Sequence, residues 1–442
     1  MIRVERARRL LAAERDTTRT TEALARASFA TLTDDDAARL IARGSALNDA
    51  DRTRLLAIRD RFRSWPLGAD TLATLRFRTS GLRRLATIFL RLARPDDAID
   101  TLHMAIESFD DPEARGVAQA SDLAELLEIE AFEQSLLLAV GRADEAAAEA
   151  TAAIGRLEHL IATHPELERH LPGAWGALAI AESRRGRLDE AATLAHRAVD
   201  ACDRFLAAAP DDVGLLVALL PVYLNVAAQP ALGFDDDARV GLYARAADLA
   251  EEGLGTFDEA HESLGASALI GLSGMADIDL ARGRPAAALD AVERRSVLAR
   301  HLAAEIPDSE LISSEPMATA RQAYLCLAAL GRPGDAREDL EAAIGLATRA
   351  VAAEPALVSR ARVLGWVLEA LAEVEVAEHH PEAAIALYGR IVEVLGPWTA
   401  GGQAPPDIAE LEARARAALD RLAVGEAPPP EQSQADAASA PR

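Results

Sequence analysis

The sequence contains no lysine: all 47 of its basic residues are arginine. A Walker A loop, a protein-kinase site and a Schiff-base enzyme each need a lysine side chain, so the sequence excludes these three kinds of site. We interpret the absence as a coding bias toward arginine; avoidance of lysine-directed modification is the alternative.

Cysteine is nearly as scarce. Cys202 and Cys326 lie far apart and form no Cys-x-x-Cys motif, which indicates a reducing compartment rather than a disulfide-bonded secreted protein. The first residues, MIRVERARRLLAAERD, contain no apolar run of the length that a signal peptide needs. We therefore expect a cytoplasmic protein.

Aromatic residues make up only 4% of the chain, although hydrophobic residues make up 50%. Alanine accounts for most of the difference. Because alanine combines high helix propensity with little bulk, such a composition favours closely packed helices. No segment alternates apolar and polar residues for more than a few positions, so we predict an all-α fold.

One uncharged run, residues 213–234, is long enough to span a membrane. Pro221, Asn225, Gln229 and Pro230 interrupt it, and its flanks are acidic rather than basic. We predict a buried helix here and no membrane association.

Charge is unevenly distributed in this chain of net charge −24. Residues 1–92 contain 19 arginines and 11 acidic residues, whereas the rest contains 28 arginines and 60 acidic residues. An acidic surface repels nucleic acid and anionic lipid. Nucleic acid is therefore an unlikely partner, and the basic N-terminal segment is the only candidate to bind it.

A short motif recurs along the chain at intervals of 45 to 50 residues. It usually begins with glycine, as in GRADEAA at Gly141 and GRLDEAA at Gly186. The starts are Ala93, Gly141, Gly186, Gly233, Gly283, Gly331 and His379. Five residues after each start stands an alanine: Ala98, Ala146, Ala191, Ala238, Ala288, Ala336 and Ala384.

The motif has a physical explanation. Its glycine permits the left-handed turn that ends one helix, and its acidic residue suits the positive N-terminus of the next. The alanine allows the second helix to approach the first closely, and a proline 24 residues after several starts ends that helix. Each unit is thus predicted to be a helical hairpin, and tandem units form a solenoid.

This pattern resembles the tetratricopeptide repeat family, in which alanines follow the glycine after five and twelve residues. The family's unit has about 34 residues, so each helix is expected to be longer here by about seven residues, or two turns. The large aromatic residue of the family's first helix is mostly missing. The resemblance covers residues 67–398 and implies a right-handed α-α superhelix of about seven hairpins.

Four regions follow from these patterns. Residues 1–66 form a basic helical segment that includes a predicted helix at 49–63, and residues 67–398 form the repeat array. Residues 399–424 are a linker and a capping helix, and residues 425–442 are a disordered tail. We expect the N-terminal segment to cap or dock on the acidic array; binding of an acidic partner and binding of DNA are alternatives.

No motif in the chain supports catalysis or metal binding. His159, His164 and His170 lack helical ligand spacing, and the pair His379–His380 occupies a repeat turn. The segments HESLG at His261 and GLSGM at Gly271 match neither a zinc protease motif nor a nucleophile elbow. We predict a non-enzyme without cofactor or metal.

In the resembled family, the first helices of successive repeats line a concave groove that holds a peptide. The resemblance places seven residues in such a groove: Arg83, Arg91, Arg184, Tyr223, Asp277, Arg321 and Trp366. The alternative for each is a solvated face or a contact between repeats. The family's carboxylate-binding asparagine and lysine set is absent, although an arginine can bind a carboxylate through two hydrogen bonds.

These observations predict a non-catalytic scaffold or adaptor that binds a protein or peptide. The alternative is a regulatory sensor, in which the array responds to a peptide or small ligand and controls the basic N-terminal segment, with a role in transcription as one version.

Overall fold

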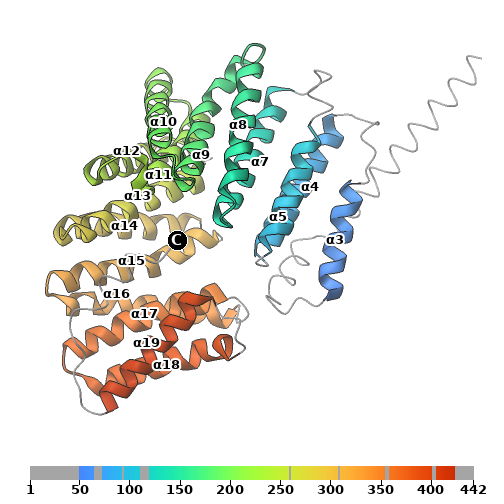
Figure 1. Ribbon diagram of the computed structural model, residues 1–442. Coiled ribbons are helices and arrows are strands. Elements are labelled where there is room, and N and C mark those ends of the chain that lie inside the picture. The colour runs from blue at the N-terminus through green and yellow to red at the C-terminus, as the bar shows by residue number, and fades with distance from the viewer. Residues whose placement is uncertain are drawn as a thin grey trace, which may run out of the picture. The chain divides into compact units, whose positions relative to one another are not determined.

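The computed structural model describes residues 49–63, 72–91, 94–109, 119–257, 260–306, 309–353, 358–400 and 405–423. Within these ranges every regular element is a helix (Figure 1). The predicted all-α class is therefore confirmed. The expectations for residues 1–48 and for the tail concern residues outside the described ranges, whereas the helix predicted at 49–63 in the N-terminal segment is present as Asp49–Arg63.

The chain divides into two compact units, Met1–Leu194 and Ala195–Arg442. The boundary falls inside one helix, α10 (Leu188–Ala208), and the sequence pattern did not predict it. The first unit contains α3 (Asp49–Arg63), α4 (Leu72–Arg91), α5 (Pro95–Glu107), α7 (Ala120–Ala139), α8 (Ala143–Leu160), η3 (Pro165–His170) and α9 (Leu171–Arg184).

The second unit continues the array to the C-terminal helix. It contains α11 (Val213–Ala227), η4 (Pro230–Leu232), α12 (Asp236–Leu254), α13 (His261–Ala281), α14 (Pro285–Glu305), α15 (Glu310–Ala329), η6 (Pro333–Ala336), α16 (Arg337–Ala353), α17 (Val358–Ala377), α18 (Pro381–Thr399) and α19 (Pro406–Ala423). The described helices α4 to α18 thus supply the seven predicted hairpins, from α4/α5 to α17/α18.

The glycine of the repeat motif forms the turn of the hairpin. Its φ lies between 69° and 81° at Gly141, Gly186, Gly233, Gly283 and Gly331. After Gly141, Gly186, Gly283 and Gly331 the next residue donates its backbone N–H to the carbonyl five residues earlier, as from Arg142 to Leu137 at 2.8 Å. This is the Schellman ending, which requires a left-handed residue. His379 takes the same conformation, with φ 63°.

Six of the seven repeat alanines are buried, at 1% exposure or less: Ala98, Ala146, Ala191, Ala288, Ala336 and Ala384. Ala238 is exposed, so the prediction was wrong at this position. The helix after Gly233 begins three residues later instead of two, which advances the turn by one residue. Arg239 takes the equivalent position instead and donates from Nε to the Ala227 carbonyl at 2.7 Å.

Two glycines allow α13 to approach α12 closely. A Cβ at Gly271 would lie 2.8 Å from the Tyr243 carbonyl oxygen, and one at Gly274 would lie 2.4 Å from the Tyr243 ring. The GLSGM segment therefore serves helix packing.

The second unit contains two strongly apolar helices, α11 and α13, and both are largely buried. The run that begins at Val213 forms α11, which has 15 residues and nine buried side chains. Among the described helices, α13 is long and apolar enough to cross a membrane, and 67% of its apolar window is buried inside the fold. Both behave as core helices, as predicted for the first.

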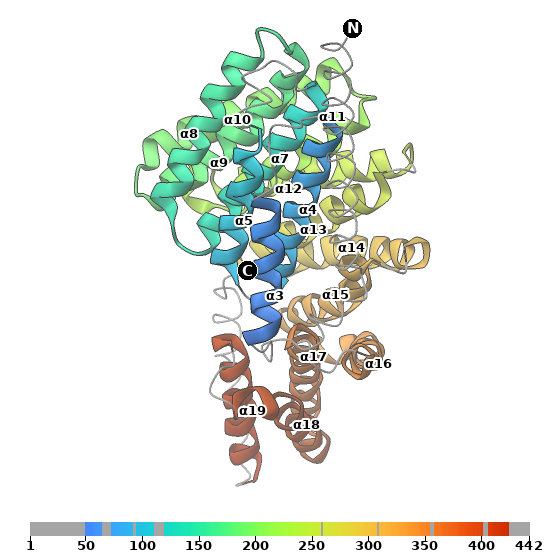
Figure 2. The ribbon, with the colours of Figure 1, turned by 90° about the vertical axis from the view of Figure 1, so that its right-hand side faces the viewer.

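The C-terminal helix α19 packs on α17 and α18 (Figures 1 and 2). Ile408, Leu411 and Ala415 are fully buried, and Leu419 and Leu422 pack beside them. Leu411 covers Gly365 of α17, where a Cβ would lie 2.9 Å from its methyl group. This apolar face is the one predicted for a capping helix.

Candidate functional site

Many polar side chains of the array are used to join one repeat to the next. The hydrogen bonds concerned link residues 43 to 49 positions apart, which is about one repeat. They run from Arg76 to Asp122, Arg83 to Glu128, Arg294 to Glu251, Gln322 to Asp277, Tyr324 to Glu373 and Arg414 to Glu369. A residue predicted to line a groove must therefore be checked for such a bond.

In the first unit, two predicted groove residues make these contacts. Arg83 donates to Glu128 at 3.0 Å. Arg184 donates to the backbone carbonyl of Leu138, one repeat earlier. Arg91 is the last residue of α4, and its side chain is outside the described part. Arg83 and Arg184 thus fit the alternative of a contact between repeats.

Tyr223 in the second unit is a core residue and does not face a groove. Its side chain is fully buried, and its hydroxyl donates to Asp203 at 2.6 Å. Arg245 pairs with the same carboxylate at 2.8 Å. Burial raises the pKa of the Tyr223 hydroxyl, and the bond to Asp203 raises it further. The repeat pattern did not predict this burial. On the first helix of a hairpin, the positions that face the core lie next to the positions that face outward.

Asp277 belongs to a polar network between α13, α14 and α15. Its carboxylate accepts from Gln322 Nε2 at 2.6 Å, and Gln322 in turn accepts from Arg295 at 2.7 Å. Arg295 is 6% exposed and also pairs with Glu315 at 2.5 Å. It stands twelve residues after Gly283, where other repeats carry a buried alanine. Its guanidinium is fully engaged inside the fold.

The last two predicted residues come together. The Arg321 guanidinium carbon, on α15, lies 5.3 Å from the centroid of the Trp366 ring on α17. Arg362 lies 5.9 Å from the same centroid and pairs with Asp407 of α19 at 2.9 Å. Both distances are within the range of a cation–π interaction. Arg321 and Trp366 are each partly exposed.

Arg321 differs from the other predicted arginines whose side chains the structure describes. It makes no hydrogen bond or ion pair with any described residue, and its one specific contact is the Trp366 ring. Burial lowers its pKa, which means that the surroundings solvate its charge poorly. A guanidinium has five N–H donors, so this group retains capacity for an acceptor.

Glu373 of α17 lies beside this pair. Its Oε2 accepts from the Tyr324 hydroxyl at 2.7 Å. Burial raises the pKa of Glu373 to about 7, and the charge of Glu369 raises it too. Arg321 and Arg414 oppose the shift. Glu369 is itself held by Arg414 through two hydrogen bonds of 2.9 and 3.0 Å.

We name Arg321, Trp366, Glu373 and Tyr324 the Arg321 site. It is built by α15 and α17, with α19 supplying Arg414 beside it. The repeat pattern predicted Arg321 and Trp366 as site residues but not Glu373 and Tyr324. The repeat spacing was a usable signal, since Tyr324 and Glu373 stand 49 positions apart.

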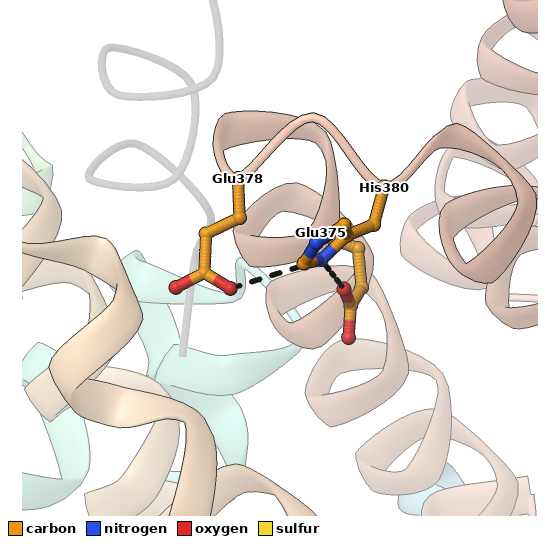
Figure 3. A group of neighbouring side chains, drawn as sticks. All are labelled: Glu375, Glu378 and His380. Carbon is orange, nitrogen blue, oxygen red and sulfur yellow. Dashed lines mark hydrogen bonds and ion pairs between the residues drawn. The ribbon is translucent and has the colours of Figure 1, made fainter.

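A second group, Glu375, Glu378 and His380, has ligand atoms close enough to hold a metal ion (Figure 3). Arg337 already pairs with both carboxylates of this group, because its Nη2 donates to Glu375 at 3.1 Å and to Glu378 at 2.5 Å. These bonds lower the pKa of Glu375. The turn arginines Arg187 and Arg284 pair with buried acidic residues five positions earlier, as His380 does with Glu375 at 3.0 Å, so the arrangement is structural.

Both cysteines are buried. Burial raises the pKa of the Cys202 thiol to about 12 and that of Cys326 to about 11. The thiolate is the reactive form, so neither residue suits a nucleophilic or redox role.

No family model matches the chain, and no curated protein matches it. Solved structures similar to it include a tetratricopeptide repeat protein from Parabacteroides merdae ATCC 43184, at 12% identity and TM-score 0.31, over 76% of this chain and 98% of that one. The assembly chaperone of RpL4 (Acl4) is 17% identical at TM-score 0.30, over 77% and 96%. The human IFIT1 dimer with PPP-AAAA is 13% identical at TM-score 0.32, over 92% and 84%.

The helical-repeat class is established by the seven hairpins themselves.

Proposed function

We propose that this protein is a non-enzymatic, cytoplasmic scaffold or adaptor that binds a protein or peptide partner at the Arg321 site. One observation carries the proposal: among the predicted groove arginines with described side chains, Arg321 alone is left without a hydrogen-bonded partner. Stacking on Trp366 holds its planar group in place, and a pre-positioned arginine loses less entropy when it binds.

The array suits a binding role for a further reason. Its repeats are joined by hydrogen bonds at several points, and six of the seven repeat alanines are buried within the hairpins. Such a scaffold holds a site on helices rather than on loops, and helices position side chains more accurately.

Selection of peptides from a random display library against the full-length protein at pH 6 tests the proposal. Replacement of Arg321 by methionine keeps the bulk over Trp366 and removes the charged donors. Because a hydrogen bond to a charged group contributes about 1.5–3 kcal/mol, we expect selected peptides to bind Arg321→Met about 10- to 100-fold more weakly in fluorescence anisotropy.

The matched control is Arg83→Met. It removes an arginine that also lies on the first helix of a hairpin but is paired with Glu128 in the first unit. We expect it to bind the same peptides with unchanged affinity. Recovery of no peptide, or equal affinity of the Arg321→Met protein, would refute the proposed function.

A further inference from the structure

We propose that the Arg321 site binds one carboxylate of the partner and that Glu373 takes up a proton from solvent as it does so. The inference rests on the proposed function and adds the chemical group recognised and a linkage between binding and protonation.

The argument for a carboxylate begins with Arg321. Its guanidinium lies over the Trp366 ring and has no hydrogen-bonded acceptor among the described residues. Stacking on the ring involves the face of the guanidinium, so the N–H groups on its edge remain able to donate hydrogen bonds. A planar fork of donors matches the two oxygens of a carboxylate.

The surrounding charges favour a ligand with a single negative charge. Arg362 is paired with Asp407, and Arg414 is paired with Glu369. Arg321 is therefore the one cation of the cluster that no described carboxylate pairs with directly. A dianionic phosphate would carry more charge than one guanidinium balances, and it would face the carboxylates of Glu369 and Glu373.

The argument for proton uptake rests on the neighbours of Glu373. Tyr324 and Arg321 face it from α15, Glu369 from its own helix, Arg414 from α19 and Tyr388 from α18. Burial and Glu369 destabilise its charge, while the Tyr324 hydrogen bond, Arg321 and Arg414 stabilise it.

A carboxylate on Arg321 neutralises one of the two charges that support ionised Glu373 and adds a repulsive charge. Protonation of Glu373 removes this repulsion. The Tyr324 hydroxyl can still donate to the other carboxyl oxygen, so the neutral form keeps its hydrogen bond.

Propionate, the side-chain analogue of a glutamate carboxylate, is the probe. The full-length protein is labelled with 5-fluorotryptophan, and the fluorine resonance of Trp366 is assigned with the Trp366→Phe variant. Titrations at pH 6 and pH 8 and constant ionic strength give the dissociation constants, and propionamide serves as the uncharged control.

With Glu373 titrating near pH 7, about one site in ten holds the proton at pH 8. We therefore expect propionate to bind about tenfold more weakly at pH 8 than at pH 6. Glu373→Gln, a neutral isostere that can still accept from Tyr324, is expected to bind equally at both pH values. Arg321→Met and propionamide should give no saturable shift.

The outcomes separate this inference from the proposed function. Propionate binding that depends on Arg321 but not on pH would overturn the proton linkage and leave the binding function intact. Absence of propionate binding by the unaltered protein at pH 6 would overturn the carboxylate assignment, whatever the peptide selection shows. Peptide binding without dependence on Arg321 would overturn both.

Discussion

Some acidic side chains of this array are buried at places where the nearby groups only partly balance their negative charge. Glu133 of α7 is 2% exposed, and Nδ1 of the His103 ring on α5 lies 3.4 Å from its carboxylate. Burial raises the pKa of Glu133 to about 7, and Glu149 contributes to the increase. His103 and Arg142 oppose the shift without cancelling it.

Glu133→Gln should stabilise the protein in mild alkali. The folded-state pKa lies above the unfolded value of about 4.3, so folded Glu133 binds the proton more tightly and its ionisation lowers stability as pH rises from about 4.3 to 7. We expect the variant to gain about 1–3 kcal/mol over the unaltered protein at pH 8 and less at pH 5.5, measured by urea unfolding.

Glu158→Gln, on the exposed surface of α8, is the control and should change stability by less than about 0.5 kcal/mol. A gain from Glu133→Gln that is as large at pH 5.5 as at pH 8 would contradict the assignment.

Single residues also show where sequence reasoning stops. Arg321 and Trp366 were predicted to share a face and do so, because first-helix positions one repeat apart are neighbours. Tyr223 was misplaced, because a shift of one helical position moves a side chain from the surface into the core. The pairing of Arg83 with Glu128 depends on side-chain rotamers, which a repeat pattern does not specify.

At the scale of the element, the hairpin turn was the most predictable feature. A left-handed residue ends the first helix, and glycine adopts this conformation without strain. The turn after Gly233 was the exception, since one additional residue there advances Ala238 to the surface. The sequence DDD gave no indication of which aspartate begins the helix; Asp235 caps it through the Ala238 N–H at 2.8 Å.

His379→Gly should stabilise the α17/α18 turn. His379 has a φ of 63°, which costs a residue with a Cβ roughly 1–2 kcal/mol, and the greater freedom of glycine in the unfolded chain offsets part of that gain. We expect a net increase of about 0.5–1 kcal/mol in the free energy of unfolding.

The reciprocal variant, Gly331→His, places a side chain in the same conformation one repeat earlier, where a Cβ would meet no atom within 4 Å. It should lose a similar amount of stability. If both substitutions changed stability in the same direction, the backbone explanation would be wrong.

At the scale of the whole molecule, the division into two units was not predictable. The repeat spacing passes through the boundary at residues 194 and 195 without interruption, since Gly186 and Gly233 are separated by a normal interval. Periodicity indicates that neighbouring hairpins are alike, and it carries no signal for a division between them. The packing of α19 on α17 and α18 was predictable, because α19 carries a single apolar face that needs to be covered.

Deletion of residues 401–442 should loosen the end of the second unit alone. The truncation removes Leu411 from Gly365 and leaves Glu369 without Arg414. In a repeat protein each hairpin depends on its neighbours. We expect faster amide hydrogen exchange in α17 and α18 and unchanged exchange in α4 to α9, measured by mass spectrometry.

A chain that ends after Ala423 retains α19 and should exchange like the full-length protein. Uniform loss of protection across both units on deletion of residues 401–442 would show that the array unfolds as one body.

The bonds that span one repeat also limit how this chain can change in length. Duplication or loss of a complete hairpin keeps the first helices in register, so the position of Arg83 in one repeat still faces the position of Glu128 in the next. Insertion of a few residues into a first helix would instead rotate its polar side chains away from their hydrogen-bond partners in the two adjacent repeats. Viable length variants should therefore differ by multiples of about 48 residues, with smaller changes confined to the loops.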